Sequence, residues 1–227
     1  MRSFIFDFNG TLYQDCPMHL AAWGRFYRKY GVPFTQDMFY KYMCGPPNNE
    51  IIHRMLGDDL PEAVVDQMSE EKEGFYRQIV LDDPSLRSLT PGAAEMLDMM
   101  KARGVPFAIA TGSIRSNVDF YMNTLHIDRW FDYDHIFHAH EGVPGKPDPA
   151  VYRLAMQKLG YAPEETVVVE DGLAGVQSAI GAGVKSIIAI DTTLGADAFR
   201  DIPQVVAIIH DFYGFERFIG QQQEVLP

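Results

Sequence analysis

The chain has 227 residues, of which 47% are hydrophobic and 22% charged, and its formal net charge is −12 at pH 7. This composition excludes a wholly disordered or collagen-like chain, and no apolar run approaches the length of a membrane span. The acidic balance argues against a nucleic-acid partner, and two cysteines are too few for a disulfide framework, so we predict a cytoplasmic protein without nucleic-acid or membrane partners.

The first predicted element is a buried strand at residues 4–6, which ends at Asp7. Residues 14–82 then follow a different pattern, because their apolar side chains recur at helical spacing and no convincing strand is present. The charged stretch 70–73 predicts a solvated face on the last of these helices. We expect four helices, one ending before Gly31, one capped by Thr35, one capped by Asn49 and a long one beginning at Pro61.

Residues 83–227 alternate short apolar runs with amphipathic stretches of helical length. The predicted strands are 105–110, 166–169, 186–190 and 205–209, and the predicted helices are 92–102, 114–125, 149–159 and 173–182. This alternation is typical of right-handed βαβ units and an open parallel sheet. We therefore predict an α/β fold, with a Rossmann-like parallel sheet core flanked by helices (1–13 and 83–227) and an inserted α-helical cap domain (14–82).

Four polar segments lie at or near the ends of these strands and helices. In an open parallel sheet the ligand binds at the carboxyl ends of the strands, so we expect the four segments to meet there. They are Asp7-Phe8-Asn9-Gly10-Thr11, Thr111-Gly112-Ser113, Gly145-Lys146-Pro147-Asp148-Pro149 and Glu170-Asp171-Gly172.

The order of these segments resembles the haloacid dehalogenase superfamily, specifically its phosphoglycolate-phosphatase and β-phosphoglucomutase branch with an inserted helical cap. The resemblance covers nearly the whole chain, and the segments around Lys146 and Asp171 are its most specific part. His19 and Trp23 add to it, because they follow the first segment at the spacing seen in sugar-phosphate mutases. It implies Mg²⁺-assisted phosphoryl transfer on a small phosphorylated metabolite, and we expect a monomer or a weak homodimer.

The carboxylates suit a phosphoryl-transfer site. Asp7 can attack phosphorus and form an aspartyl-phosphate, but its charge repels a phosphate dianion unless a hard cation is present. We expect Asp7, Asp171 and the backbone carbonyl of Asn9 to bind Mg²⁺, with Glu170 in the same metal site as the residue that orients the ligands. The sequence thus predicts both the nucleophile and the metal.

The remaining residues suit a phosphate. Lys146 supplies a compact positive charge for the phosphate and the nucleophile, and Thr111 supplies a hydroxyl. Gly112 leaves room for phosphate oxygens beside backbone N–H groups, and Gly10 permits a close backbone approach just after the nucleophile. Together they form a charge-neutralising cradle.

Asn9 departs from the family pattern. Family phosphatases usually have a second aspartate there, which protonates the leaving group and then activates water. An amide does neither near neutral pH, and losing such help typically costs about 10²–10⁴ in rate. His19 is our candidate substitute acid, because the natural pKa of histidine suits proton transfer near neutrality.

Other functions remain open at this point. A mutase is disfavoured, since asparagines follow Gly45 where mutases look as if they use an arginine, and a carbon–phosphorus hydrolase is disfavoured, since no lysine follows Gly45 in that loop. A haloacid dehalogenase is less favoured because the Glu170-Asp171 pair is retained. A non-enzymatic phosphate- and metal-binding protein is the remaining alternative, and Asn9 favours it. A zinc site at His135, His138 and His140 lacks a completing ligand and is disfavoured.

Overall fold

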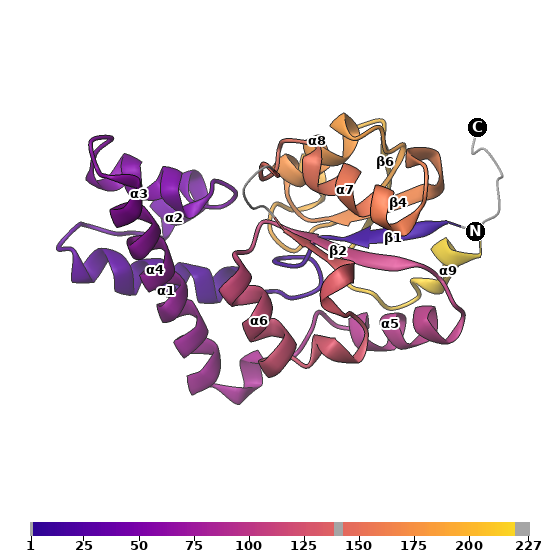
Figure 1. The fold of residues 1–227 in the computed structure, drawn as a ribbon, viewed down its shortest axis with the longest axis horizontal. Helices are drawn as coiled ribbons and strands as arrows, with labels where there is room; N and C mark the ends of the chain where they lie inside the picture. Colours follow the sequence, from indigo (N-terminus) through magenta and orange to yellow (C-terminus); the bar gives the residue numbers. More distant parts are fainter. Residues whose placement is uncertain (1, 139–142, 221–227) are drawn as a thin grey trace. The chain divides into compact units, whose positions relative to one another are not determined.

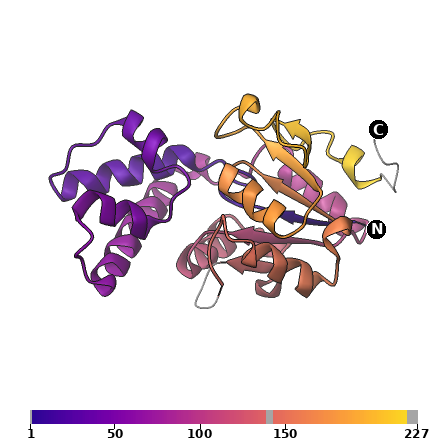
Figure 2. The ribbon, with the colours of Figure 1, turned by 90° about the horizontal axis from the view of Figure 1, so that it is seen from above.

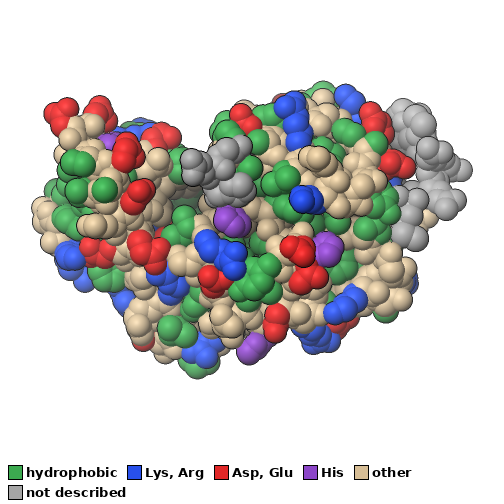
Figure 3. Space-filling model, in the orientation of Figure 1, with side chains coloured by type: hydrophobic (Ala, Val, Ile, Leu, Met, Phe, Trp, Pro, Cys, Tyr) green, Lys and Arg blue, Asp and Glu red, His purple; other side chains and the backbone are tan. Residues whose placement is uncertain are grey.

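The computed structural model describes residues 2–138 and 143–220. The chain divides into two compact units, which we call the sheet unit (Met1–Gln14 with Ser88–Pro227) and the helical unit (Asp15–Arg87). Within the described residues, no helix combines the length and apolar character that a membrane span requires. On the face shown in Figure 3, acidic and basic side chains are interspersed, so the net charge is not gathered into one patch there.

The sheet unit is built on a parallel sheet, and this confirms the predicted α/β class. Across the described residues the strand order is β3-β2-β1-β4-β5-β6, and every neighbouring pair is parallel. The strands are β1 (Ser3–Phe6), β2 (Phe107–Thr111), β3 (Ile136–His138), β4 (Thr166–Glu170), β5 (Ser186–Ile190) and β6 (Val205–Ile209). Because β1 lies between β2 and β4, the loops after these three strands are neighbours.

The largest differences from the predicted strands are at β2 and β3. β2 begins at Phe107 instead of residue 105, because Pro106 has no N–H and the N–H of Val105 donates to the carbonyl oxygen of Met100 at 3.0 Å. β3 was not predicted at all, since its three residues are too short to show a periodic pattern.

Helices cover both faces of the sheet (Figures 1 and 2). On one face, α7 and α8 pack over a core that includes Ile5, Val168 and Tyr152. On the other, the rings of Phe4 and Phe6 contact those of Phe215 and Phe212 at centroid distances of 5.7 Å and 6.1 Å. The helices of this unit are α5 (Ala93–Ala102), α6 (Arg115–Thr124), α7 (Ala150–Leu159), α8 (Leu173–Gly181) and α9 (Glu216–Ile219).

The helical unit contains helices and no strand (Figure 2). They are α1 (Cys16–Lys29), α2 (Gln36–Tyr42), α3 (Asn48–Leu56) and α4 (Glu62–Asp82). The Thr35 cap is confirmed, because its side chain accepts a hydrogen bond from the Met38 N–H at 3.2 Å. The Asn49 cap is wrong: the N-cap is Pro47, two residues earlier, and α3 begins at Asn48. The large side chains of α1, α3 and α4 form this unit's own core, which includes Trp23, Phe26, Ile52 and Val65.

Candidate active site

The four polar segments meet at the carboxyl end of the parallel sheet. Asp7 follows β1, Thr111 is the last residue of β2, and Glu170 is the last residue of β4. Lys146 comes from the loop before α7 and reaches the same place, since its Nζ lies 2.6 Å from Asp7 Oδ1. The topology therefore brings together residues that are far apart in the chain, such as Asp7 and Lys146, which are 139 positions apart.

Lys146 is the positive centre of this site. Its Nζ donates to Asp7 Oδ1 and to Glu170 Oε1, both at 2.6 Å, and to the carbonyl oxygen of Ala110 at 2.8 Å. Burial alone would lower the pKa of Lys146, but the charges of Asp7 and Glu170 more than offset it, so its pKa lies above its usual value. The lysine therefore stays charged between two carboxylates.

Asp7, Glu170 and Asp171 are buried, and each offers an oxygen within 4.8 Å of the others. Burial raises the pKa of Asp7 to about 7, with Lys146 opposing the shift and Glu170 adding to it. Burial also raises the pKa of Asp171, and the charges of Asp7 and Glu170 raise it further. When all three carboxylates are ionised, the single ammonium group of Lys146 leaves two negative charges uncompensated. This donor set fits a hard divalent cation, which would cancel them.

Two glycines have no room for a side chain beside these carboxylates. A Cβ on Gly10, which has a φ of +81°, would lie 2.0 Å from Asp171 Oδ2. A Cβ on Gly175 would lie 1.7 Å from Glu170 Oε1. The backbone must therefore pass close to Asp171 at Gly10, in the loop after β1. It must also pass close to Glu170 at Gly175, in α8.

Glu170 already has protein donors at both of its oxygens. Oε1 accepts from Lys146 and from the Tyr152 hydroxyl, the latter at 2.8 Å. Oε2 accepts from the N–H groups of Asp171 and Gly172 at 3.1 Å and 3.2 Å. With its oxygens engaged in this way, Glu170 is suited to orienting Lys146 and the loop that carries Asp171.

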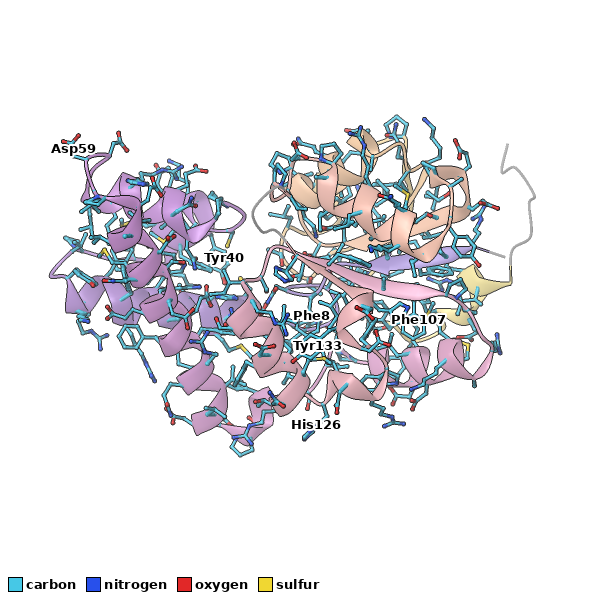
Figure 4. All side chains as sticks on the ribbon, in the orientation of Figure 1. Phe8, Tyr40, Asp59, Phe107, His126 and Tyr133 are labelled. Atoms are coloured by element: carbon cyan, nitrogen blue, oxygen red, sulfur yellow. The ribbon has the colours of Figure 1, made fainter. Side chains whose placement is uncertain are left out.

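The side chain of Asn9 is held by three hydroxyl groups. Its Nδ2 donates to the Tyr121 hydroxyl at 2.9 Å, and its Oδ1 accepts from Thr111 at 3.2 Å and from Ser113 at 2.6 Å. The Tyr121 ring in turn stacks on Phe8, which Figure 4 labels, at a centroid distance of 4.4 Å. The amide therefore bridges the loop after β1 to the loop after β2 and to α6.

The family model for haloacid dehalogenase-like hydrolases matches residues 1–183. The chain belongs to this family. A haloacid dehalogenase hydrolase of family IA, variant 3, from Entamoeba histolytica has a solved structure that is 32% identical, with a TM-score of 0.86, over 93% of this chain and 94% of that one. The resemblance to the superfamily and its phosphoglycolate-phosphatase and β-phosphoglucomutase branch is confirmed.

Two curated relatives are similar along most of the chain. The phosphorylated carbohydrates phosphatase of Thermotoga maritima is 28% identical over 194 residues, which are 84% of this chain and 85% of the relative. The phosphoglycolate phosphatase of Pseudomonas putida is 26% identical over 187 residues, which are 82% of this chain and 68% of the relative. This haloacid dehalogenase-like chain thus matches phosphatases through both of its units.

His19 belongs to the helical unit and is part of a second buried cluster. Its Nδ1 lies 2.7 Å from Lys72 Nζ and its Nε2 lies 3.3 Å from Asp15 Oδ2, while its ring stacks on Tyr76 at 4.2 Å. Lys72 also pairs with Glu73 Oε1 at 2.8 Å.

The prediction of a solvated face at 70–73 is wrong for Lys72 and Glu73, which are buried. The apolar stripe Val65, Met68, Tyr76 and Val80 has the helical spacing that includes position 72 and signals this burial.

Sequence reasoning also missed residues beside the site in the sheet unit. Thr192 and Thr193 follow β5 and donate hydrogen bonds to the Gly10 carbonyl oxygen and to Asp171 Oδ2. Their signal was available, since they come just after a predicted strand.

Of the three histidines weighed as a zinc site, His135 pairs with Asp132 at 2.6 Å, His138 ends β3, and His140 lies outside the described residues.

Proposed function

We propose that this chain is a Mg²⁺-dependent phosphatase that hydrolyses a small phosphorylated metabolite through an aspartyl-phosphate on Asp7. The observation that carries the proposal is the position of Asp7 at the carboxyl end of β1, where its Oδ1 lies 2.6 Å from Lys146 Nζ and its carboxylate lies beside those of Glu170 and Asp171. The relative from Thermotoga maritima, named for phosphorylated carbohydrates, supports a sugar phosphate as the substrate class.

The proposed reaction has two displacements at phosphorus. In the first, a carboxylate oxygen of Asp7 attacks the phosphorus and the bond to the leaving oxygen breaks. Lys146 and the Thr111 hydroxyl neutralise and hold the phosphate oxygens, together with the backbone N–H of Gly112. In the second, water attacks the phosphorus, inorganic phosphate leaves and the Asp7 carboxylate is restored. The ester and one water thus give an alcohol and inorganic phosphate, with one proton passing overall from the water to the leaving oxygen.

Asp7, Asp171 and the backbone carbonyl of Asn9 would hold the cation, and Glu170 would orient these ligands. When bound, Mg²⁺ supplies the positive charge that lets a carboxylate approach a phosphate dianion. The fit rests on the hard oxygen donors and on the two uncompensated negative charges of the cluster. We further propose that the helical unit serves as a cap that excludes water during transfer.

The leaving oxygen needs a proton that Asn9 does not supply. We propose that His19, which contacts Lys72 and Asp15, donates this proton. The measurement is the pH profile of turnover for His19→Ala. If His19 supplies the proton, the variant loses the alkaline limb of the profile, and an unchanged profile would exclude the role.

The central experiment is a phosphatase screen over small phosphorylated metabolites, with and without Mg²⁺, in wild type and Asp7→Asn. Asp98→Asn is the matched control, because Asp98 is a carboxylate of the same unit that pairs with Arg129 away from the site. Turnover that needs both Mg²⁺ and Asp7 supports the proposal. Turnover that survives Asp7→Asn contradicts it.

A second candidate is a protein that binds phosphate and metal with little turnover. Asn9 is the observation that favours it, since its amide occupies the position of the usual acid and is held by Thr111, Ser113 and Tyr121. The Asn9→Asp variant separates the two. A large gain in turnover indicates that loss of the acid limits this chain, whereas an unchanged rate indicates that another residue supplies the proton.

A further inference from the structure

The loop after β5 contributes two hydroxyl groups to the site. Thr192 Oγ1 donates to the carbonyl oxygen of Gly10, in the loop after β1. Thr193 Oγ1 donates to Asp171 Oδ2 at 2.5 Å, in the loop after β4. The loop that follows β5 is therefore a fifth segment of the site, tied to the segments of the nucleophile and of the proposed metal ligand.

The Asp171 carboxylate is confined by this arrangement. A Cβ on Gly10 would lie 2.0 Å from Asp171 Oδ2 and 3.0 Å from Thr193 Oγ1, so these three groups are in close contact. The other carboxylate oxygen, Oδ1, accepts from the Thr11 hydroxyl at 3.3 Å, which is a longer and weaker bond. Thr193 therefore supplies the shorter of the two hydroxyl contacts that fix the rotation of this carboxylate.

The chemistry of the donor distinguishes Thr193 from Lys146. A lysine beside a carboxylate adds a positive charge that repels an incoming cation. A hydroxyl orients one oxygen of the carboxylate and leaves its negative charge uncancelled. The neutral donor on Asp171 therefore leaves the charge of this carboxylate available to a cation.

We propose that Thr193 is a positioning residue for the Mg²⁺ site, which holds the Asp171 carboxylate in the orientation that binds the cation. This inference rests on the proposed function, because it assumes that Asp171 is a metal ligand. Hydrogen bonds of this kind typically change metal affinity about 10–100-fold when they are removed. The alternative is that the hydroxyl only stabilises the fold.

The test is a calorimetric titration of the metal-free protein with Mg²⁺, so that the readout does not depend on turnover. Thr193→Val removes the hydroxyl and keeps the shape, Thr193→Ser restores a hydroxyl, and Thr193→Ala is a second deletion if the valine variant does not fold. Thr166→Val is the matched control. Thr166 is also buried, and its hydroxyl makes hydrogen bonds of 3.0 Å with Ser3 Oγ and with the Ala162 carbonyl oxygen. It lies at the opposite end of β4 from the site.

We expect Thr193→Val to weaken Mg²⁺ binding about 10-fold or more, with Thr193→Ser and Thr166→Val close to wild type. Equal affinity in Thr193→Val and wild type, or an equal loss in Thr166→Val, overturns the inference and leaves the proposed function standing. Absence of Mg²⁺ binding by wild type, together with turnover that is independent of Mg²⁺, overturns the metal part of the proposed function and this inference with it.

Discussion

Each unit of the molecule buries a lysine among carboxylates, and the two clusters are built differently. In the sheet unit, Lys146 pairs with Asp7 and Glu170, and Asp171 makes a third carboxylate. In the helical unit, Lys72 has a different set of partners. It pairs with Glu73 at 2.8 Å and contacts His19 at 2.7 Å.

The pKa shifts of the carboxylates go in opposite directions. In the sheet unit, burial raises the pKa of Asp7 by more than the charge of Lys146 lowers it, so this pKa rises to about 7. In the helical unit burial also acts to raise the pKa of Glu73, but Lys72, His19 and the Asn48 amide outweigh it and lower that pKa to about 2. The first cluster lacks positive charge, which is the condition for binding a cation, whereas the second satisfies its carboxylate within the protein. We therefore expect substitutions in the first cluster to affect turnover, and substitutions of Lys72 and Glu73 in the second cluster to affect stability.

Asp7→Asn is expected to have the largest effect. It removes the proposed nucleophile, so turnover should fall by at least about 10⁴-fold while the fold remains. Steady-state turnover of the best substrate, with circular dichroism as the control for folding, checks this. Residual turnover within tenfold of wild type would mean that the cluster of Asp7, Lys146 and the other carboxylates in the sheet unit is not the site of the chemistry.

Exchanging each lysine for methionine tests the comparison directly. Lys72→Met leaves Glu73 buried without its cation, and the free energy of unfolding should fall by about 3–5 kcal/mol, measured by urea denaturation. Lys146→Met should lower turnover by about 10²–10³-fold. The double variant Lys72→Met/Glu73→Met is the control, because replacing both charges with apolar side chains should recover much of the lost stability. If Lys72→Met is as stable as wild type, the cluster of Lys72, Glu73 and His19 in the helical unit, which we call the helical cluster, does not stabilise the fold.

The sequence was informative where chain order and topology act together. Asp7, Thr111 and Glu170 all stand at the end of an apolar run, and parallel pairing alone places such residues at one edge. Lys72 and Glu73 were misread because charged residues are rarely buried, and only their partners on other helices make the burial tolerable. Thr193 could have been suspected from its place after a predicted strand, but its hydrogen bond to Asp171 is visible only in the folded chain.

Acid should destabilise the helical cluster through Glu73. Its pKa is about 2 in the folded chain against an ordinary 4.5, so the unfolded chain takes up the proton first as the pH falls. The stability that depends on the ionised carboxylate is present above about pH 4.5 and is lost between there and about pH 2, amounting to about 3 kcal/mol. Lys72, His19 and Asn48 are the groups that face it.

The measurement is the free energy of unfolding against pH for wild type and Glu73→Gln. The glutamine has no proton to take up, so the difference between the two curves should shrink as the pH falls through this window. Parallel curves would show that Glu73 ionises alike in the folded and unfolded chain, and the contrast with Asp7 would lose its basis.

The smallest expected effect concerns the neutral donor in the helical cluster. The Asn48 amide donates to Glu73 Oε1 at 2.7 Å and to Ser69 Oγ at 3.1 Å, so Asn48→Ala removes one of the bonds that hold the buried charge. A hydrogen bond to a charged group is worth about 2 kcal/mol, and we expect a loss of that size in the free energy of unfolding. Asn49→Ala is the matched control, since the side chain of this exposed neighbour accepts a hydrogen bond from the adjacent N–H of Glu50. Equal losses in the two variants would mean that Lys72 and His19 hold the charge of Glu73 without the amide, and that the helical cluster is satisfied by charge alone.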